Sequence, residues 1–453
     1  MSGTTAKNGT ISVAFGLARR QGASIAAIRV GGAGLALAAQ ILASRLLGPD
    51  EFGRYSLLLV WLLVLGYAAT AGSGQLLCRY VAQYVKAGDR QSLAGLLRAG
   101  LAGILGVSIL LAAAAISVVL LFPVGLDRGM LLVGVLALSA VPLVALQDYL
   151  ESIARGLDRP ALGIGPAFFA RHLAVIAGLL ALLLLGERAT AVAVMGFTIA
   201  GLFASVLTQY ALLHRHLHPL ISGVTPRYEV RRWIKTALPL AGTDVTEMLL
   251  LNADVLILGL FVTPEQVAFY FAATRLAQIL AYVPYSATAA TAQKFAGLGA
   301  PAGRAELQAL IGRTATLSTL VTGFGALLLS LCAAPLLSMF GEDFAVAAPI
   351  VVLLSLGILV SCAFGPGEDV LNMLGEERIC SLGFLLALMV NLALNFALIP
   401  FLGLAGAAIA TFSALALRGA LLASFARLRL GLVLPAFLSL MPPAEHREVP
   451  HEA

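Results

Sequence analysis

Four arginines interrupt long apolar stretches of this chain, at Arg29, Arg171, Arg275 and Arg418. A charged side chain inside a bilayer costs roughly 2.5 kcal/mol or more unless it faces a partner or a water-filled cavity. A guanidinium group binds phosphate oxygens through two parallel hydrogen bonds, so a cavity lined by arginines would suit a diphosphate group. We favour this role for Arg29 and Arg275. For Arg171, which adjoins His172, and for Arg418, ion pairing within the protein and a functional role are equally open.

Helical spacing places polar side chains near two of these arginines. Gln40 lies about 20° from Arg29 around a helix axis, so the two share one face. A second stripe, within roughly 80° of Arg275, consists of Gln278, Tyr282 and Tyr285. These groups are candidates to bind sugar hydroxyls and ring faces, although packing at the membrane interface would suit the tyrosines equally well.

Carboxylates and amides form a second set of candidates, for binding a coupling cation. Asp244, Glu247 and Asp254 fall within about 80° on one helix face. Farther along the chain, Asn391 and Asn395 are four positions apart and therefore stack on one face. Together with Asp254, these amides and the later Thr411 could supply the oxygens of a sodium site. Hydrogen bonding of the amides between helices is the slightly favoured alternative, and proton coupling through the acids is another.

Other chemistry is not expected. The four cysteines are scattered, and the chain has no Walker-type glycine-rich loop for ATP. His214, His216 and His218 lie in a basic segment without an acidic or cysteine partner nearby, so surface electrostatics explains them better than a metal. We therefore expect neither an enzyme nor a cofactor-binding protein, and no metal apart from sodium.

Composition shows which elements must position these residues. Of all residues 60% are hydrophobic and only 11% are charged, against about 25% charged in a soluble domain. About twelve segments are long and apolar enough to cross a bilayer as helices, and the alternation of a β-barrel is absent. The expected spans are 24–44, 54–73, 96–122, 130–150, 162–186, 190–213, 234–260, 267–291, 314–338, 345–365, 379–400 and 404–426. The sequence thus predicts an all-α integral membrane protein.

The two halves of the chain repeat each other. LLGPDEFGRYSLLL at 46–59 recurs in looser form as LFVTPEQVAFYFAA at 260–273, with an offset of 215 positions between Pro49 and Pro264 and between Tyr55 and Tyr270. In each copy a proline begins a turn and an aromatic residue follows it, at Pro49 and Tyr55 and again at Pro264 and Tyr270. Many transporters are built from such repeats. We expect a cytoplasmic N-terminal segment at 1–21, bundles at 22–213 and 234–426, a basic linker at 214–233 and a cytoplasmic tail at 427–453.

The distribution of positive charge predicts the orientation. With the N-terminus inside, 21 of the 29 Lys and Arg residues fall on the cytoplasmic side, 4 on the other side and 4 within the membrane. Both termini are therefore expected in the cytoplasm. The net charge of +6 is explained by these loops without invoking nucleic acid. The basic linker is expected to lie against anionic headgroups, with Trp233 at the membrane interface.

Three patterns then point to a family. They are ILASRLLGPDEFGRYSLL with the following GSGQLLCRYVAQY, then DVLILGLFVTPEQVAFYFAATRL, and finally the spacing NxxxNxxLIPxxGxxGAAxAT that begins at Asn391. Together, from about residue 21 to 427, they resemble the polysaccharide or O-antigen (Wzx-type) flippase family, within the superfamily that includes multidrug extruders and lipid II flippases. The resemblance implies two six-helix bundles, V-shaped about a central cavity, that rock between inward-open and outward-open states.

The resemblance also implies a cargo and roles for individual residues. The cargo would be an oligosaccharide on a polyprenyl diphosphate, moved to the periplasmic leaflet of a bacterial inner membrane for synthesis of lipopolysaccharide O-antigen or exopolysaccharide. Arg29 and Arg275 would face the diphosphate. The sodium ligands of the lipid II branch would fall at Asp254, Asn391, Asn395 and Thr411, with Asn395 where a carboxylate would bind more strongly. Membrane lipids, a polysaccharide polymerase and chain-length proteins are the expected partners.

Two other functions are weighed against this reading. A multidrug exporter of the same fold would carry organic cations, and its cavity should be lined by acids and aromatic rings, which the arginines disfavour. A membrane scaffold of a polysaccharide assembly complex would not transport, so neutral substitutions of Arg29 and Arg275 should then be tolerated. The short segment after the twelfth span lacks the additional two-helix lipid groove of the lipid II branch, which favours the polysaccharide type.

Overall fold

The computed structural model describes residues 3–122, 127–298 and 303–438, with side chains from residue 27 onward except at a few positions between 289 and 296. These residues form helices and include no strand, which confirms the predicted all-α class. The chain divides into two compact units. The first contains Met1–Phe271 with Ser338–Asp343, and the second contains Ala272–Leu337 with Phe344–Ala453. The predicted bundles, 22–213 and 234–426, follow the sequence repeat and stay a prediction.

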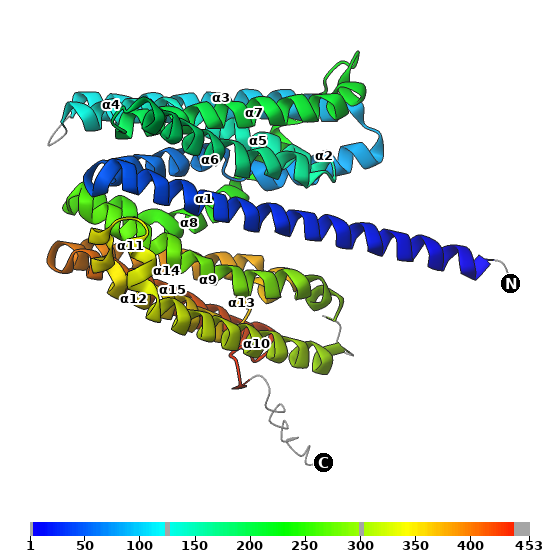
Figure 1. Cartoon of the computed structure of the whole chain (residues 1–453). Helices are drawn as coiled ribbons and strands as arrows, with labels where there is room; N and C mark the ends of the chain where they lie inside the picture. Colours follow the sequence, from blue (N-terminus) through cyan, green and yellow to red (C-terminus); the bar gives the residue numbers. More distant parts are fainter. Residues whose placement is uncertain (1–2, 123–126, 299–302, 439–453) are drawn as a thin grey trace. The chain divides into compact units, whose positions relative to one another are not determined.

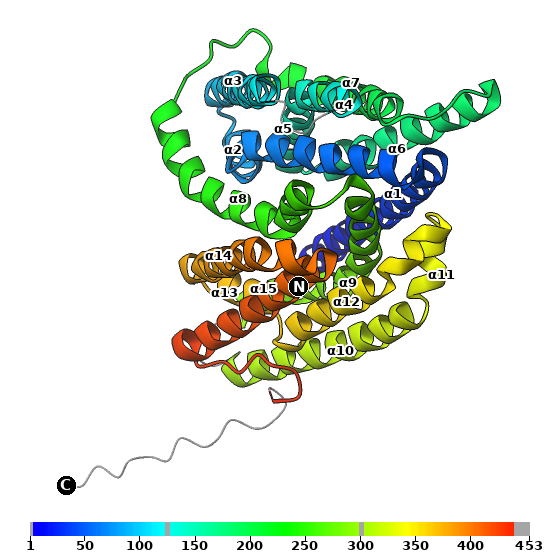
Figure 2. The same cartoon turned by 90° about the vertical axis from the view of Figure 1, so that its left-hand side faces the viewer.

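The helices of the first unit are α1 (Gly3–Thr70), α2 (Ser73–Ala87), α3 (Arg90–Leu121), α4 (Arg128–Ser139), α5 (Val141–Gly156), α6 (Pro160–Leu185), α7 (Ala191–Ile221), α8 (Val230–Phe261) and the start of α9 (Pro264–Gly297). Figures 1 and 2 show α5 lying among its neighbours, and it packs against α1, α2, α3, α6 and α7. A core of aromatic and aliphatic side chains between α2, α3 and α5 includes Leu77, Tyr80 and Tyr149.

The second unit contains the rest of α9, then α10 (Arg304–Leu331), α11 (Ala333–Ser338, whose last residue belongs to the first unit), η2 (Glu342–Ala347, mostly in this unit), α12 (Ala348–Ala363), α13 (Gly367–Met373), α14 (Glu377–Leu402), α15 (Leu404–Phe425) and η3 (Ala426–Leu430). Within it, α15 packs against both α14 and α12, and α12 packs against α10. Glycines and alanines of α15 are fully buried, for example Ala407, which lets the helices approach closely.

Ten helices of the described residues are long and apolar enough to span a membrane. One of them, Ala27–Thr70, contains the first two predicted spans. It breaks at Gly48, whose φ of 76° lies in the left-handed region, and Pro49 opens the second half. The predicted span at 234–260 corresponds to α8, which falls outside the ten because its charged and polar residues lower its hydropathy. The predicted count of about twelve is therefore approximate.

The repeated turn appears in both halves of the sequence. Just as Pro49 follows the break in α1, Pro264 opens α9 after the end of α8. The aromatic residue that follows is buried in each copy, with Tyr55 5% and Tyr270 0% exposed. The two turns also meet, because a Cβ on Gly53 would lie only 1.7 Å from the carbonyl oxygen of Pro264. Glycine is therefore required at position 53.

The acidic residues of the first turn bind the starts of neighbouring helices. Glu51 Oε2 accepts a hydrogen bond from the backbone N–H of Ala191, the first residue of α7, at 2.8 Å. Arg54 bridges Asp50 at 2.9 Å and Asp127, the N-cap of α4, at 2.5 Å. The PDEFGR sequence thus positions three helices through charge-assisted contacts.

The segment before α8 differs from the prediction. Trp233 is not at the membrane interface: it is 5% exposed within the core of the first unit, and its indole N–H donates to Tyr84 Oη at 3.1 Å. Glu229 precedes α8 and accepts hydrogen bonds from Arg227 and Arg232, at 2.5 and 3.0 Å. These two guanidinium groups, Arg227 first, lower the pKa of Glu229. The start of α8 is thereby fixed to α2.

The chain after α15 packs back onto the second unit. Gln308 of α10 pairs with the backbone of Val433 through two hydrogen bonds of 2.7 and 3.0 Å. Leu432 and Leu434 are 2% and 0% exposed. Residues 431–438, predicted to belong to a tail, are therefore an integral part of the packing of the second unit.

Candidate functional site

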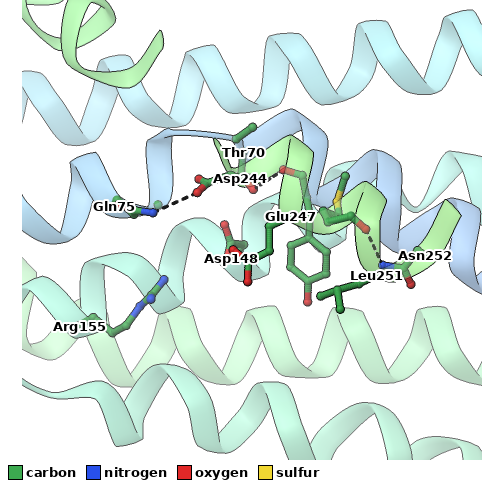
Figure 3. A pocket seen from close by; sticks show the side chains of 12 residues that line it. Thr70, Gln75, Asp148, Arg155, Asp244, Glu247, Leu251 and Asn252 are labelled. Atoms are coloured by element: carbon green, nitrogen blue, oxygen red, sulfur yellow. Dashed lines mark hydrogen bonds between the residues drawn. The ribbon is translucent and has the colours of Figure 1, made fainter. Parts of the chain in front are cut away.

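A polar cavity of about 360 Å³ lies within the first unit, where the end of α1 and the helices α2, α5 and α8 meet (Figure 3). Its volume falls at the lower end of the range for small-molecule sites, about 300–1,000 Å³. Carboxylates, amides, one guanidinium and aromatic and aliphatic groups line it. The lining residues are Tyr67, Thr70, Ala71, Gly74, Gln75, Asp148, Arg155, Asp244, Glu247, Met248, Leu251 and Asn252.

Asp244 binds the break between α1 and α2. Its Oδ2 accepts a hydrogen bond from the backbone N–H of Gly72 at 2.9 Å, and its Oδ1 accepts one from Gln75 Nε2 at 3.0 Å, the latter visible in Figure 3. Gly72 has a φ of 72°, and a Cβ there would lie 2.1 Å from the carbonyl oxygen of Ala237 on α8. The break therefore requires glycine and brings α8 close enough for its carboxylate to bind exposed backbone at a helix end.

The opposite wall is a polar stripe on α5. Asp148, Ser152 and Arg155 are spaced four and three residues apart, which places them on one helix face. Arg155 donates to Ser152 Oγ at 3.0 Å, and its Nε lies 3.9 Å from a carboxylate oxygen of Glu151. Gly74 of α2 faces this stripe, and a Cβ there would lie 3.2 Å from Ser152 Oγ. The absent side chain leaves the stripe room beside α2.

The cavity carries net negative charge. Three carboxylates, those of Asp148, Asp244 and Glu247, line it with a single guanidinium, that of Arg155. Asp148 on α5 and Asp244 on α8 both line it, so their carboxylates share one cavity. Like charges in such a space are stabilised by a proton, a cation or a hydrogen-bond donor placed between the carboxylates. The lining therefore favours hydroxyl and ammonium groups over phosphates.

Among the candidates from the sequence, the cavity brings together Asp244 and Glu247. Arg29 is half-buried, does not line the cavity, and interacts electrostatically with Glu151 beneath the α5 stripe. Arg171 likewise lies outside the lining, where it interacts with Tyr67 and contacts His172 at 3.4 Å. Gln40, expected on the same face as Arg29, is half-buried on α1.

The second arginine stripe lies on α9, in the second unit. Arg275 Nη1 donates to Gln278 Oε1 at 2.9 Å, so the two side chains do share a face. Tyr282 and Tyr285 continue along the helix and are 42% and 52% exposed. Arg275 itself is half-buried. This helix therefore presents a guanidinium, an amide and two phenol rings in sequence.

The cation candidates fall in both units. Asp254, in the first unit, is 5% exposed and accepts hydrogen bonds from Tyr270 Oη at 2.6 Å and from the Val255 N–H at 2.8 Å. Asn391 and Asn395, in the second, are 1% and 0% exposed, and Asn395 Nδ2 donates to the side-chain oxygen of Asn391 at 3.0 Å.

Thr411 is half-buried on α15, the helix that packs against the one carrying the asparagine pair. The amide stacking expected from the sequence is therefore present. The sodium ligand set of which it would be part stays a prediction.

Three polar residues of α5 were missed from the sequence: Asp148, Glu151 and Arg155. The predicted span ends at residue 150, which leaves Arg155 in a loop, whereas α5 continues to Gly156. The signal was present in the spacing, because residues three, four and seven apart share a helix face.

In the part of the chain that the structure describes, no three His, Cys, Asp or Glu side chains are grouped to hold a metal. The histidines instead extend a ladder of rings along α7. The ring centroids of Tyr210 and His214 are 5.5 Å apart, and those of His214 and His218 are 5.2 Å apart.

Solved structures of similar fold are membrane transporters. The chain matches the lipid II flippase MurJ in an inward closed conformation with a TM-score of 0.71 and 12% identity, covering 89% of this chain and 87% of that one. An inward-facing multidrug resistance MATE family transporter of the MOP superfamily gives 0.66 and 15%, with 88% and 94% covered. A MOP superfamily transporter from Pyrococcus furiosus gives 0.54 and 13%, with 89% and 92% covered. These likenesses establish the fold.

No curated protein sequence matches the chain. A family model described as "Polysaccharide biosynthesis protein", however, matches residues 18–292, which is more than half of the chain. The matched region includes the repeated turns, the polar cavity and the Arg275 stripe. This multi-pass helical membrane protein therefore belongs to the polysaccharide biosynthesis protein family.

Proposed function

We propose that the protein is a flippase that moves a polyprenyl-diphosphate-linked oligosaccharide from the cytoplasmic to the periplasmic leaflet of a bacterial inner membrane, for synthesis of surface polysaccharide such as O-antigen. The observation that carries the proposal is the polar stripe on α9, where Arg275 holds Gln278 at 2.9 Å within a candidate membrane span of a polysaccharide biosynthesis protein. Both termini lie in the cytoplasm in this proposal, because positive loops are retained there.

Electrostatics explains why a diphosphate needs such a stripe. The headgroup cannot enter hydrocarbon alone, whereas a guanidinium group can replace its water through paired charge-assisted hydrogen bonds. The prenyl chain remains in lipid while the headgroup passes. Arg275 binds the diphosphate on the second unit, and Arg29 is the equivalent cation of the first. Gln278, Tyr282 and Tyr285 offer hydroxyl-binding and stacking surfaces beside it.

Coupling to a cation would return the empty carrier to its cytoplasm-facing state, because the inside-negative membrane potential draws a cation inward. The candidate groups are Asp244 and Glu247 in the cavity, buried Asp254, and the Asn391, Asn395 and Thr411 group. The coupling ion is sodium or a proton. In this scheme, cation binding returns the empty carrier to the state that accepts cargo.

The test uses cells that lack the protein. They should accumulate polyprenyl-diphosphate-linked oligosaccharide facing the cytoplasm, and the wild-type gene should clear it. Arg275→Ala should fail to clear it at normal protein abundance, whereas Arg275→Lys should restore part of the activity. Absence of accumulation, with unchanged surface polysaccharide, would refute the proposal.

Arg418→Ala is the matched control, because Arg418 is also an arginine within a candidate membrane span and it contacts side chains of two neighbouring helices. Its guanidinium lies 5.1 Å from the ring centre of Phe384 and 3.5 Å from Ser361 Oγ. We expect this variant to lower abundance, with activity per molecule retained. If Arg275→Ala lowered abundance in the same way, Arg275 would be structural.

One observation favours a second candidate function, export of organic cations. The polar cavity of the first unit is lined by three carboxylates and one guanidinium group, and such an acidic lining is expected for a cationic cargo. In that case deletion should sensitise cells to quaternary ammonium compounds without accumulation of lipid-linked oligosaccharide.

A further inference from the structure

We propose that the polar cavity of the first unit binds the sugar end of the cargo and selects neutral and amino sugars over sugars that bear a carboxylate; this inference rests on the proposed flippase function. It assigns the diphosphate and the oligosaccharide to different places on the protein. The diphosphate binds arginine, and the sugars bind the cavity between α1, α2, α5 and α8.

The charge of the cavity excludes the diphosphate. Its three carboxylates outnumber its one guanidinium, and Arg155 is already engaged with Ser152 at 3.0 Å and lies 3.9 Å from Glu151. An added anion would be repelled by the carboxylates of Asp148, Asp244 and Glu247 in the lining. The same repulsion acts on the carboxylate of a uronic acid. Sugar charge is therefore the property that this cavity discriminates best.

The remaining lining suits hydroxyl groups and a sugar ring. Carboxylate oxygens accept hydrogen bonds from hydroxyls, and the amides of Gln75 and Asn252 offer both donor and acceptor atoms. Tyr67 is 41% exposed and presents an aromatic surface at the cavity, against which an apolar ring face can stack. Leu251 extends the apolar part of the wall.

An ammonium group gains most from this arrangement. Asp148 on α5 and Asp244 on α8 approach from facing helices, so a single cation placed between them interacts favourably with both. Asp244 keeps its oxygens in place through Gly72 and Gln75, which holds the acceptor geometry before a ligand arrives. A prepositioned acceptor loses less entropy on binding. The expected order of affinity is therefore amino sugar, then neutral sugar, then acidic sugar.

The experiment is calorimetric titration of the full-length protein in lipid nanodiscs. The probes are a glucosamine disaccharide, its N-acetylated form, a disaccharide containing glucuronic acid, and tetraphenylphosphonium as an organic cation without sugar hydroxyls. The wild type should bind the glucosamine disaccharide at least about tenfold more tightly than the acidic one, a difference of about 1.4 kcal/mol. Equal or tighter binding of the acidic disaccharide would overturn the inference.

Asp148→Asn is the informative variant, because it removes charge at nearly constant shape and leaves the backbone contacts of Asp244 intact. It should reduce the preference for the amino sugar about tenfold, while Glu265→Gln, an exposed acid outside the cavity, should change nothing. Asn252→Asp tests the opposite change, because the added carboxylate should increase the preference for the amino sugar over the acidic sugar. If this preference were unchanged in both cavity variants, the proposed selectivity would be refuted.

The remaining outcomes separate this inference from the proposed function. Binding of tetraphenylphosphonium without binding of any disaccharide would assign the cavity to organic cations and overturn the inference. In a second outcome, deletion cells accumulate lipid-linked oligosaccharide while the protein binds the amino and acidic disaccharides equally well. That combination would reject the proposed sugar selectivity and would still support the flippase function. Mass analysis of that accumulated lipid should show no uronic acid, and finding one would also reject the selectivity.

Discussion

Replacing Tyr270 by phenylalanine removes a hydroxyl from the hydrogen bond that holds a buried carboxylate. Tyr270 is 0% exposed, and its Oη donates to Asp254 Oδ2 at 2.6 Å. The sequence repeat supplies a matched control at Tyr55, which is 5% exposed and hydrogen-bonds to Thr198 Oγ1 at 3.0 Å. Thr198 donates its own proton to the Val194 carbonyl, so Tyr55 donates to a neutral hydroxyl. The two substitutions thus compare a charged acceptor with a neutral one in equivalent positions.

The coupling energies expected for the two hydrogen-bonded pairs differ. Hydrogen bonds between polar side chains within membranes contribute about 0.6 kcal/mol on average and reach about 1.7 kcal/mol. A bond to a charged group contributes about 1.5–3 kcal/mol in proteins generally. We therefore expect Tyr270 and Asp254 to couple by about 1.5 kcal/mol, and Tyr55 and Thr198 by about 0.6 kcal/mol.

The assay is a pair of double-mutant cycles on the free energy of unfolding, measured by sodium dodecyl sulfate titration in mixed micelles. One cycle combines Tyr270→Phe with Asp254→Asn, and the other combines Tyr55→Phe with Thr198→Val. Circular dichroism before titration checks that each variant retains its helices.

A coupling energy for the Tyr270 pair no larger than that for the Tyr55 pair would refute the reasoning. It would mean that Asp254 does not act as a charged acceptor in the folded protein. Asp254 would then be a poorer candidate for cation binding, because a coupling cation requires the carboxylate.

Three further predictions concern other parts of the fold. Gly53→Ala should lower abundance strongly, because its Cβ would overlap backbone that opens α9, whereas Gly103→Ala, with open space around it, should be tolerated in the same immunoblot. Because the pKa of Glu229 is lowered in the folded protein, its contribution to stability is present above the unfolded value of about 4.3 and is lost as pH falls through the folded pKa; Glu229→Gln should therefore flatten the fall in melting temperature below about pH 4.5. Gln308→Leu should remove two hydrogen bonds and speed proteolysis at 431–438, and an unchanged cleavage rate would show that those bonds do not hold the segment.

The fold class could be predicted from composition because a bilayer leaves helices as the only solution for segments this apolar. The breaks between helices were harder to place. Pro49 and Pro264 marked two of them, since proline favours the first turn of a helix. The span predicted at 54–73 ends close to the break at Gly72, where glycine is required by a distant contact with α8. The α2 helix that follows is not predicted, because its 15 residues, with Arg79 and Lys86 among them, do not make a membrane span.

The candidate site shows the same limit. Helical spacing correctly grouped Arg275 with Gln278, because both lie on one helix. Hydropathy hid Asp148 within the apolar span predicted at 130–150, and it left Arg155 beyond the end of that span although α5 continues to Gly156. The cavity itself depends on which faces of four helices meet, and spacing within one helix carries no information on that. The same reason explains why Trp233, expected at the interface, is buried against Tyr84 instead.

The two repeated turns share their packing residues but not their charges. Both copies have the proline and the buried tyrosine. Their polar partners have changed: the position equivalent to Asp254 in the first copy is Ala39, which is 3% exposed. The repeat is therefore a symmetry of packing and not of charge, because one turn is preceded by a buried carboxylate and the other by a buried methyl group.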